Sequence, residues 1–238
     1  MPEPSSASQP SQGFAQAVSV ARMQQIDAAA IETMGIPRLL LMDHAGLAVA
    51  RAAKTLCPDA SAPVVACCGT GWNGGDGLAA ARHLSAWGYP LRLLVTGRVD
   101  RLREEPATYA RVLQRLGLSV HECRQAEEAA PLERWLAECG VVIDALLGVG
   151  MQGAVREPVA SVIDRINRSG RPVVAVDVPS GLDADTGRVQ GVAIRATVTV
   201  TFGLAKRGCL IQDGPAYVGS LIVDPITIPP ALLHGSPP

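Results

Sequence analysis

Two glycine-rich loops each follow an apolar segment that has the length of a buried strand. The first loop, Gly69-Thr-Gly-Trp-Asn-Gly-Gly-Asp-Gly77, comes after residues 62–68, and the second, Gly148-Val-Gly-Met-Gln-Gly153, comes after residues 141–147. Glycines at the end of a strand let backbone N–H groups approach a diphosphate, and a following helix adds the positive end of its dipole. Two such loops predict a nucleotide-binding sheet more strongly than a single G-x-G-x-x-G pattern does.

The segments around these loops alternate between strand and helix patterns. Strands are expected over residues 62–68, 91–95, 118–122, 141–147, 173–178, 196–202 and 220–223. Helices are expected over residues 20–34, 39–56, 74–87, 104–116, 127–138 and 155–168, with Ser19 as the first N-cap. This alternation predicts an α/β fold, a three-layer Rossmann-like sandwich with a mostly parallel sheet and helices on both faces.

Length and charge narrow the class of protein. The chain has 238 residues and a net charge of −1, which suits one α/β domain and argues against nucleic acid or an anionic membrane as the main partner. No apolar stretch is long enough to span a bilayer, and residues 1–13 lack the pattern of a signal peptide. We expect a disordered tail over 1–17, one domain over 18–230, and a tail or linker start over 231–238.

The cysteines and histidines give little sign of a metal centre. Six cysteines form no C-x-x-C pair, and four histidines show no H-E-x-x-H spacing. Reduced thiols in the core of a cytoplasmic protein are favoured over disulfides or a zinc site.

Aspartates end two of the predicted strands. Asp144 and Asp177 each follow an apolar run, where a charge is costly unless it is paired, hydrogen-bonded or bound to a cation. One such residue is explained by a carboxylate that accepts loop N–H groups, but two at the predicted ligand edge favour a functional role. Asp76 in the first loop has two open interpretations, a cap of the next helix or a ligand contact.

Three common nucleotide and hydrolase signatures do not fit. The first loop lacks the Lys-Ser/Thr of a Walker A motif, and Val178 stands where a nucleophile elbow needs glycine before Ser180. The strand after the first loop ends Val95-Thr-Gly97, without the acidic ribose reader of a nicotinamide dehydrogenase. The chain is therefore expected to bind a dinucleotide-like ligand in another way.

Four segments carry a resemblance to a known family. They are Gly69–Gly77, Asp144-Ala-Leu-Leu-Gly-Val-Gly150, Asp177-Val-Pro-Ser-Gly-Leu-Asp-Ala-Asp-Thr-Gly187 and Thr201-Phe-Gly-Leu-Ala-Lys-Arg-Gly208. With the helix that holds Arg22 and Asp27 and the segment Leu41-Met-Asp-His-Ala-Gly46, they resemble the NAD(P)H-hydrate epimerase family, the YjeF N-terminal-like domain. Two positions depart from its pattern, since Trp72 replaces an asparagine and Asp43-His44 replaces Glu-Asn.

The resemblance implies an isomerase that interconverts the R and S forms of hydrated NADH and NADPH, a repair of nicotinamide nucleotides. It implies a potassium ion held by Asn73, Asp144 and Ser180, whose oxygen atoms suit a hard cation. Asp177 is expected to be the general acid/base, and Lys206 to assist through its charge or to be a solvated loop lysine. The expected substrate-binding residues are Trp72, Asn73, Gly74, Gly75, Asp76, Gly148, Val149, Gly150, Met151, Gln152, Gly153, Ala154 and Asp177.

Trp72 belongs to this set because a large ring in a polar loop can stack on a base or nicotinamide ring. Its alternative is packing on a neighbouring helix. The family also leads us to expect a homodimer and a link to an NAD(P)H-hydrate dehydratase. Two other functions stay open: a non-catalytic nucleotide-binding or scaffold protein on the same fold, and the N-terminal part of a bifunctional epimerase/dehydratase.

Overall fold

The computed structural model describes residues 17–235, so the tail expected over residues 1–17 lies almost wholly outside the described residues. The strands are β1 Val64–Cys68, β2 Leu91–Val95, β3 Val120–Glu122, β4 Val141–Ala145, β5 Val173–Val176, β6 Val198–Phe202 and β7 Ser220–Asp224. They form one seven-stranded sheet in the order β3-β2-β1-β4-β5-β6-β7, and every pair of neighbours is parallel. The predicted α/β, Rossmann-like class is confirmed.

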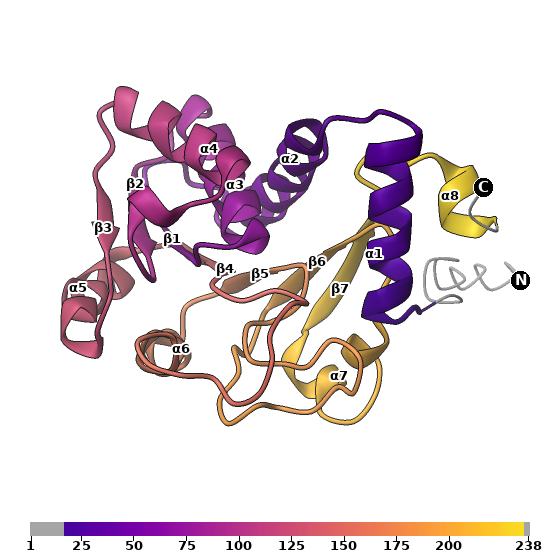
Figure 1. Ribbon diagram of the computed structural model, residues 1–238. Coiled ribbons are helices and arrows are strands. Elements are labelled where there is room, and N and C mark those ends of the chain that lie inside the picture. The colour runs from indigo at the N-terminus through magenta and orange to yellow at the C-terminus, as the bar shows by residue number, and fades with distance from the viewer. Residues whose placement is uncertain (1–16, 236–238) are drawn as a thin grey trace, which may run out of the picture.

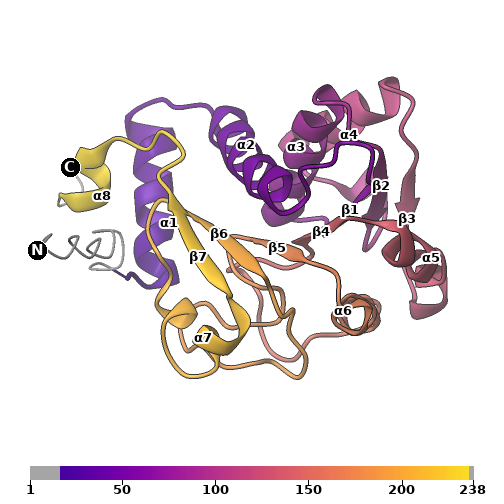
Figure 2. The ribbon, with the colours of Figure 1, turned by 180° about the vertical axis from the view of Figure 1, so that it is seen from behind.

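Helices cover both faces of this sheet (Figures 1 and 2). Their bounds are α1 Val20–Ala28, α2 Arg38–Leu56, α3 Trp72–Ala86, α4 Glu104–Arg115, α5 Pro131–Glu138, α6 Val159–Ser169, α7 Gly214–Tyr217 and α8 Pro230–His234. A π-helix, Ala29–Thr33, continues α1. Helices α1 to α4 and α8 pack on one face, while α5 and α6 pack on the other.

Strand β1 shows how the sequence builds two cores. Val64, Ala66 and Cys68 belong to the core beneath α2 to α4, whereas Val65 and Cys67 belong to the core against α5 and α6. Successive strand residues point to opposite faces, so a strand covered on both sides is apolar throughout. All six cysteines are buried and free, as expected of reduced core thiols.

Several helix ends differ from the sequence expectation. Helix α3 begins at Trp72, so the second half of the first glycine loop is already helical. Helix α6 begins at Val159 rather than at 155, with Pro158 as its N-cap. The helix expected over 127–138 is split into a 3-10 turn, Ala126–Ala129, and α5, whose first residue is Pro131. Proline lacks a backbone N–H and fits the start of a helix better than its interior.

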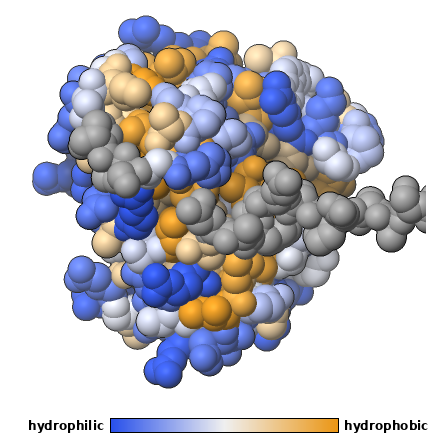
Figure 3. All heavy atoms as spheres, turned by 90° about the vertical axis from the view of Figure 1, so that its right-hand side faces the viewer, coloured by the Kyte–Doolittle hydropathy of each residue, from blue (hydrophilic) through white to orange (hydrophobic). Residues whose placement is uncertain are grey.

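The last described residues pack against the first helix. Leu232 and Leu233 of α8 are buried in the same core as Met23 of α1, and Arg22 donates a hydrogen bond of 3.0 Å to the Gly235 carbonyl. The folded part therefore continues past residue 230, and whether a linker starts after 235 stays a prediction. Figure 3 views this side, where apolar residues lie between hydrophilic ones. Within residues 17–235 no helix is long and apolar enough to cross a membrane.

Candidate functional site

Both glycine loops lie at one edge of the sheet, in contact with each other. Strands β1 and β4 are parallel neighbours, so their loops leave side by side. Asn73 Nδ2 donates a hydrogen bond of 2.9 Å to the Leu147 carbonyl. A Cβ on Gly69 would lie 2.1 Å from the Leu146 carbonyl oxygen, so only glycine permits this approach. The predicted common edge for the two loops is confirmed.

Asp144 is fully buried at the end of β4, 0% exposed, and within residues 17–235 its carboxylate accepts hydrogen bonds from neutral groups only. Ser180 donates through Oγ to Oδ1 at 2.6 Å and through its backbone N–H to Oδ2 at 2.9 Å. The Leu146 N–H donates to Oδ1 at 3.3 Å. Burial raises the pKa of Asp144 to about 6, although the hydrogen bonds from Ser180 oppose the rise.

Two of the three expected potassium ligands, Asn73 and Ser180, contact the Leu147 peptide group, and the third, Asp144, is joined to them through Ser180. The Leu147 carbonyl accepts hydrogen bonds from Asn73 Nδ2 at 2.9 Å and from Ser180 Oγ at 3.2 Å, and the Leu147 N–H donates to Ser180 Oγ at 2.9 Å. Ser180 in turn contacts Asp144. Within residues 17–235 no three His, Cys, Asp or Glu side chains form a metal-binding group. The carboxylate, hydroxyl, amide and carbonyl oxygens fit a hard monovalent cation, which would bring Asp144 the positive charge it lacks.

Asp177 ends β5 and forms an ion pair with a buried lysine. Lys206 Nζ donates to Asp177 Oδ1, which also accepts Thr201 Oγ1 at 3.0 Å and the Phe202 N–H at 3.2 Å. Lys206 is 2% exposed and also donates to the Phe202 carbonyl at 2.8 Å. The interpretation of Lys206 as a solvated loop lysine is wrong, because the turn after β6 folds its side chain inward against β5.

The backbone of Asp177 has an uncommon conformation. Its φ is 65°, in the left-handed region, and its N–H donates a hydrogen bond of 2.7 Å to the Val200 carbonyl of β6. Aspartate and asparagine tolerate this region better than most residues because their short polar side chains bond locally. The conformation turns the chain sharply at the strand end and presents the carboxylate to Lys206.

Two further carboxyl groups interact with this ion pair. Burial raises the pKa of Asp27 on α1 to about 6; the charges of Lys206 and Arg38 lower it and that of Asp177 raises it. Burial also raises the pKa of Asp76 on α3 well above its usual value, with Asp177 and Asp27 adding to the rise. Within residues 17–235 no hydrogen bond ends on either carboxyl group.

The structure excludes Asp76 as the cap of α3, and it places Asp27, which sequence analysis did not assign to the site, near the ion pair. Asp76 does not cap α3, whose N-cap is Gly71 without a side-chain hydrogen bond. Asp27 was not among the expected site residues. Its sequence signals were its place in the helix at which the family resemblance begins and its apolar neighbours Met23 and Ile26, a pattern that surface helices share.

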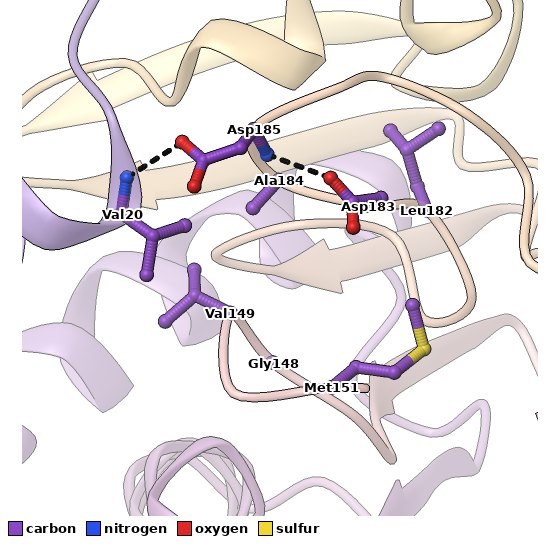
Figure 4. Close-up of a pocket in the computed structure, with 8 residues that line it drawn as sticks. All are labelled: Val20, Gly148, Val149, Met151, Leu182, Asp183, Ala184 and Asp185. Atoms are coloured by element: carbon purple, nitrogen blue, oxygen red, sulfur yellow. Dashed lines mark hydrogen bonds between the residues drawn. The ribbon is translucent and has the colours of Figure 1, made fainter. Parts of the chain in front are cut away.

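A cavity of about 110 Å³ opens between the second glycine loop, α1 and the loop after β5 (Figure 4). Its lining residues are Val20, Gly148, Val149, Met151, Leu182, Asp183, Ala184 and Asp185. Of the expected substrate-binding residues, Gly148, Val149 and Met151 line it, whereas residues 72–76, Gly150, residues 152–154 and Asp177 do not.

The loop after β5 forms the wall of this cavity that sequence reasoning missed. Asp185 Oδ1 accepts the Val20 N–H at 2.8 Å and so caps the start of α1, while Asp183 Oδ1 accepts the Asp185 N–H at 3.1 Å (Figure 4). The run Asp183-Ala-Asp-Thr-Gly187 belongs to one of the segments that resemble the family. A turn so rich in Asp and Gly was the available signal.

Trp72 packs on neighbouring helices, as its alternative interpretation held. Its ring lies 4.6 Å from the Arg38 guanidinium carbon and 4.8 Å from that of Arg103, and it packs partly buried against the core. These arginines stand at the beginnings of α2 and α4. Arg38 also acts on Asp27, so Trp72 borders the carboxyl cluster, and its contact with a ligand stays a prediction.

Asp43, one of the two departures from the family pattern, ties three helices together. Its Oδ1 accepts Arg82 of α3 at 2.7 Å and the Tyr109 hydroxyl of α4 at 3.1 Å. Burial would raise the pKa of Asp43, but Arg82 lowers it below the usual value. Asp43 of α2 is thus joined by hydrogen bonds to α3 and α4.

Known proteins share this sequence and this fold. The bifunctional NAD(P)H-hydrate repair enzyme Nnr of Pyrobaculum aerophilum is 48% identical over 201 residues, which cover 84% of this chain and 39% of that protein. The NAD(P)H-hydrate epimerase of Limosilactobacillus fermentum is 40% identical over 208 residues, which cover 87% of this chain and 95% of that protein. The chain thus spans about two fifths of the bifunctional relative's length.

A solved structure and a family model agree with these relatives. The yeast protein ynu0 matches the fold with a TM-score of 0.79 at 24% identity, over 93% of this chain and 95% of that one. The family described as YjeF-related protein N-terminus matches residues 38–208, a range that holds both glycine loops, Asp177 and Lys206. The chain belongs to this family of YjeF-related N-terminal domains.

Proposed function

We propose that the protein is an isomerase, an NAD(P)H-hydrate epimerase that interconverts the R and S forms of hydrated NADH and NADPH. One observation carries the proposal: a buried Asp177–Lys206 ion pair stands at the sheet edge where both glycine loops meet. Relatives named NAD(P)H-hydrate epimerase, such as that of Limosilactobacillus fermentum, support the same activity.

The diphosphate of the substrate binds between the two glycine loops. Helix α3 begins directly after Gly71 without a side-chain cap, so its first N–H groups are available to an anion. Asn73 to Asp76 on this helix and Gly148 to Ala154 on the second loop contact the substrate. The cavity beside Gly148 and Met151 continues toward α1 and offers room for part of the ligand.

The reaction occurs at the hydroxyl-bearing carbon beside the ring nitrogen. The nitrogen lone pair favours loss of the hydroxyl and leaves a cationic, iminium-like ring. Asp177 moves the proton, and its carboxylate stabilises the cation. The hydrogen bonds to Asp177 from residues 17–235 all end on Oδ1, so Lys206, Thr201 and Phe202 orient the carboxylate with Oδ2 left for the substrate.

Asn73, Asp144 and Ser180 hold a potassium ion in this proposal. The ion supplies positive charge beside the fully buried Asp144 and fixes the two glycine loops relative to each other. The support is the contact of Asn73 and Ser180 with the Leu147 peptide group, the hydrogen bond from Ser180 to Asp144, and the oxygen-only donor set.

A dehydratase would use the product of the proposed reaction. Bifunctional relatives such as that of Pyrobaculum aerophilum support a functional link to a dehydratase that acts on one epimer. A homodimer and a cytoplasmic location stay predictions from the sequence. The non-catalytic alternative explains the glycine loops, but it gives no reason to bury an aspartate–lysine pair beside them.

The test is an NMR or chromatographic assay of R-to-S exchange on hydrated NADH and hydrated NADPH. The wild-type protein is expected to accelerate exchange, and Asp177→Asn to abolish most of the acceleration while still binding dinucleotide. Asp164→Asn, at an exposed position of α6, is the matched control and should behave as wild type. Exchange at the uncatalysed rate with wild-type protein would overturn the proposed function.

Trp72 is proposed to border the ligand beside the first loop. Ligand is expected to quench tryptophan fluorescence, and Trp72→Phe to remove the quenching. Quenching that persists in the variant would come from Trp87 or Trp135 and would exclude this role.

A further inference from the structure

Helix α1 is fixed onto the loop that carries Lys206. Just before α1, the Val18 N–H donates a hydrogen bond of 2.9 Å to the Ala205 carbonyl, and the Val18 carbonyl accepts one of 2.9 Å from the Arg207 N–H. Farther along, a Cβ on Gly203 would lie 2.5 Å from Met23 Cε, so helix and loop are in close contact. Residues on this face of α1 consequently have a set position relative to Lys206.

Asp27 lies on the side of α1 that faces the cavity. It stands seven residues after Val20, which lines the cavity in Figure 4, and residues seven apart share one helix face. The rise along a helix places Asp27 roughly 10 Å farther along α1. The wall that starts at Val20 therefore continues to a carboxyl group.

The charges around Asp27 come from four elements. Lys206 follows β6, Asp177 follows β5, Arg38 begins α2, and Asp76 stands on α3. Lys206 donates its hydrogen bonds to Asp177, Thr201 and Phe202 rather than to Asp27. Asp27 is thus a carboxyl group that is free of hydrogen bonds from residues 17–235 and beside an ion pair that is already satisfied.

Resting on the proposed function, we propose that Asp27 is a second catalytic residue, which serves one face of the nicotinamide ring while Asp177 serves the other. Inversion requires that oxygen leave from one face and return on the opposite face. A single carboxyl group reaches only one of them. Because burial raises the pKa of Asp27 to about 6, it exchanges a proton readily near neutral pH.

The proposed step needs no reactant besides water, and proton exchange with solvent afterwards returns Asp27 and Asp177 to their starting protonation states. Protonated Asp27 gives its proton to the hydroxyl, the C–O bond breaks with its electron pair on oxygen, and water departs. The nitrogen lone pair forms the C=N bond of the cationic ring. A water molecule then adds to the opposite face and gives its proton to the Asp177 carboxylate. In the reverse direction the two residues exchange roles.

Oxygen-18 water separates this role from a merely structural one. In Asp27→Asn, Asp177 still releases and returns oxygen on its own face, so one epimer should keep exchanging its hydroxyl with labelled water. Interconversion of R and S should fall at least about tenfold relative to that exchange. Glu32→Gln removes a charge from the exposed continuation of the same helix and should leave both rates unchanged.

Each result decides between the proposals. If Asp27→Asn lowers hydroxyl exchange with labelled water and interconversion of R and S by the same factor, or lowers neither, the proposed role of Asp27 is overturned. Wild-type protein without interconversion would instead overturn the epimerase function itself. If Asp27→Asn does not fold, Asp27→Glu replaces it, because the displaced carboxyl should lower interconversion relative to exchange while the charge is kept.

Discussion

Strands β4 and β5 are neighbours, and each leads to an aspartate at the ligand edge, yet the two carboxylates have opposite surroundings. Among residues 17–235, Asp144 accepts hydrogen bonds only from the hydroxyl and N–H groups of Ser180 and the N–H of Leu146. Asp177 forms an ion pair with the ammonium group of Lys206. The described part of the chain thus supplies a positive charge to one carboxylate and none to the other.

This difference suggests how one residue type performs two tasks. A carboxylate that is paired with a lysine of the same chain has a fixed orientation and a neutralised charge before any ligand binds. This suits a group that reacts. A buried carboxylate without a cation is stabilised by one that binds from outside, which suits a metal site. Exchanging or removing the counter-charges therefore tests directly whether Asp177 takes part in the reaction and Asp144 holds a cation.

The largest effect is expected from Lys206→Met, which removes the counter-charge of Asp177 and keeps the apolar stem. An unpaired buried charge should lower the free energy of unfolding by about 3–5 kcal/mol, measured by urea denaturation. The double variant Asp177→Asn/Lys206→Met should recover part of the loss. Equal stability of the single and double variants would show that the pair is not coupled.

Asp177→Asn should lower turnover by about a hundredfold or more, because asparagine keeps the shape but cannot exchange a proton. Dinucleotide affinity of the folded variant should be nearly unchanged, since asparagine also tolerates the left-handed backbone. The free energy of unfolding should fall by about 3–5 kcal/mol, because the buried Lys206 loses its counter-charge. Turnover and affinity are measured separately. Weaker binding with unchanged saturated turnover would reduce Asp177 to a residue that orients the ribose.

The proposed cation site at Asp144 is tested by replacing potassium with a large organic cation. This replacement should lower wild-type activity by about tenfold. Asp144→Asn should begin at the lower activity and respond little to the exchange, because the charge that attracts the cation is gone. Activity assays in matched potassium and tetramethylammonium buffers check this. Equal sensitivity of both proteins to the exchange would place the cation elsewhere.

The smallest effect concerns the stability contributed by Asp27 as pH changes. Its folded-state pKa is raised from 3.8 to about 6, so the folded protein binds this proton more tightly than the unfolded chain. The cost of ionising Asp27 is absent at low pH, grows between those two values and is complete above the higher one. Asp27→Asn should thus gain on the order of 1–2 kcal/mol over wild type at about pH 7.5.

Thermal melts of both proteins at about pH 4 and about pH 7.5 measure this difference. The advantage of Asp27→Asn should vanish at the lower pH, and Glu32→Gln should show no such dependence. A constant advantage at both pH values would mean that the substitution acts through packing.

The sequence was sufficient to predict the sheet and the edge at which the loops meet. Apolar runs with glycines at their ends mark buried parallel strands, and parallel strands bring their carboxyl ends together. The approach of Ser180 to Asp144 follows from the same rule, because Asp144 stands at the end of β4 and Ser180 in the turn after the neighbouring β5, while Asn73 reaches the second loop from the first turn of α3.

What sequence reasoning missed depends on contacts between distant segments. The approach of Asp27 to Lys206 is set by how α1 packs on the turn after β6, which local patterns do not encode. The burial of Lys206 and the packing of Trp72 between Arg38 and Arg103 have the same origin. Helix ends were shifted where prolines such as Pro131 and Pro158 compete with apolar periodicity.

The left-handed backbone of Asp177 limits what evolution can place at this position. With φ at 65°, glycine and asparagine fit easily, whereas most other residues pay about 1–2 kcal/mol. Neither of the two easy replacements can carry a proton. A descendant that loses the chemistry should therefore keep the fold and the nucleotide-binding loops, and an Asn or Gly at this position would mark relatives that have turned from catalysts into binding proteins.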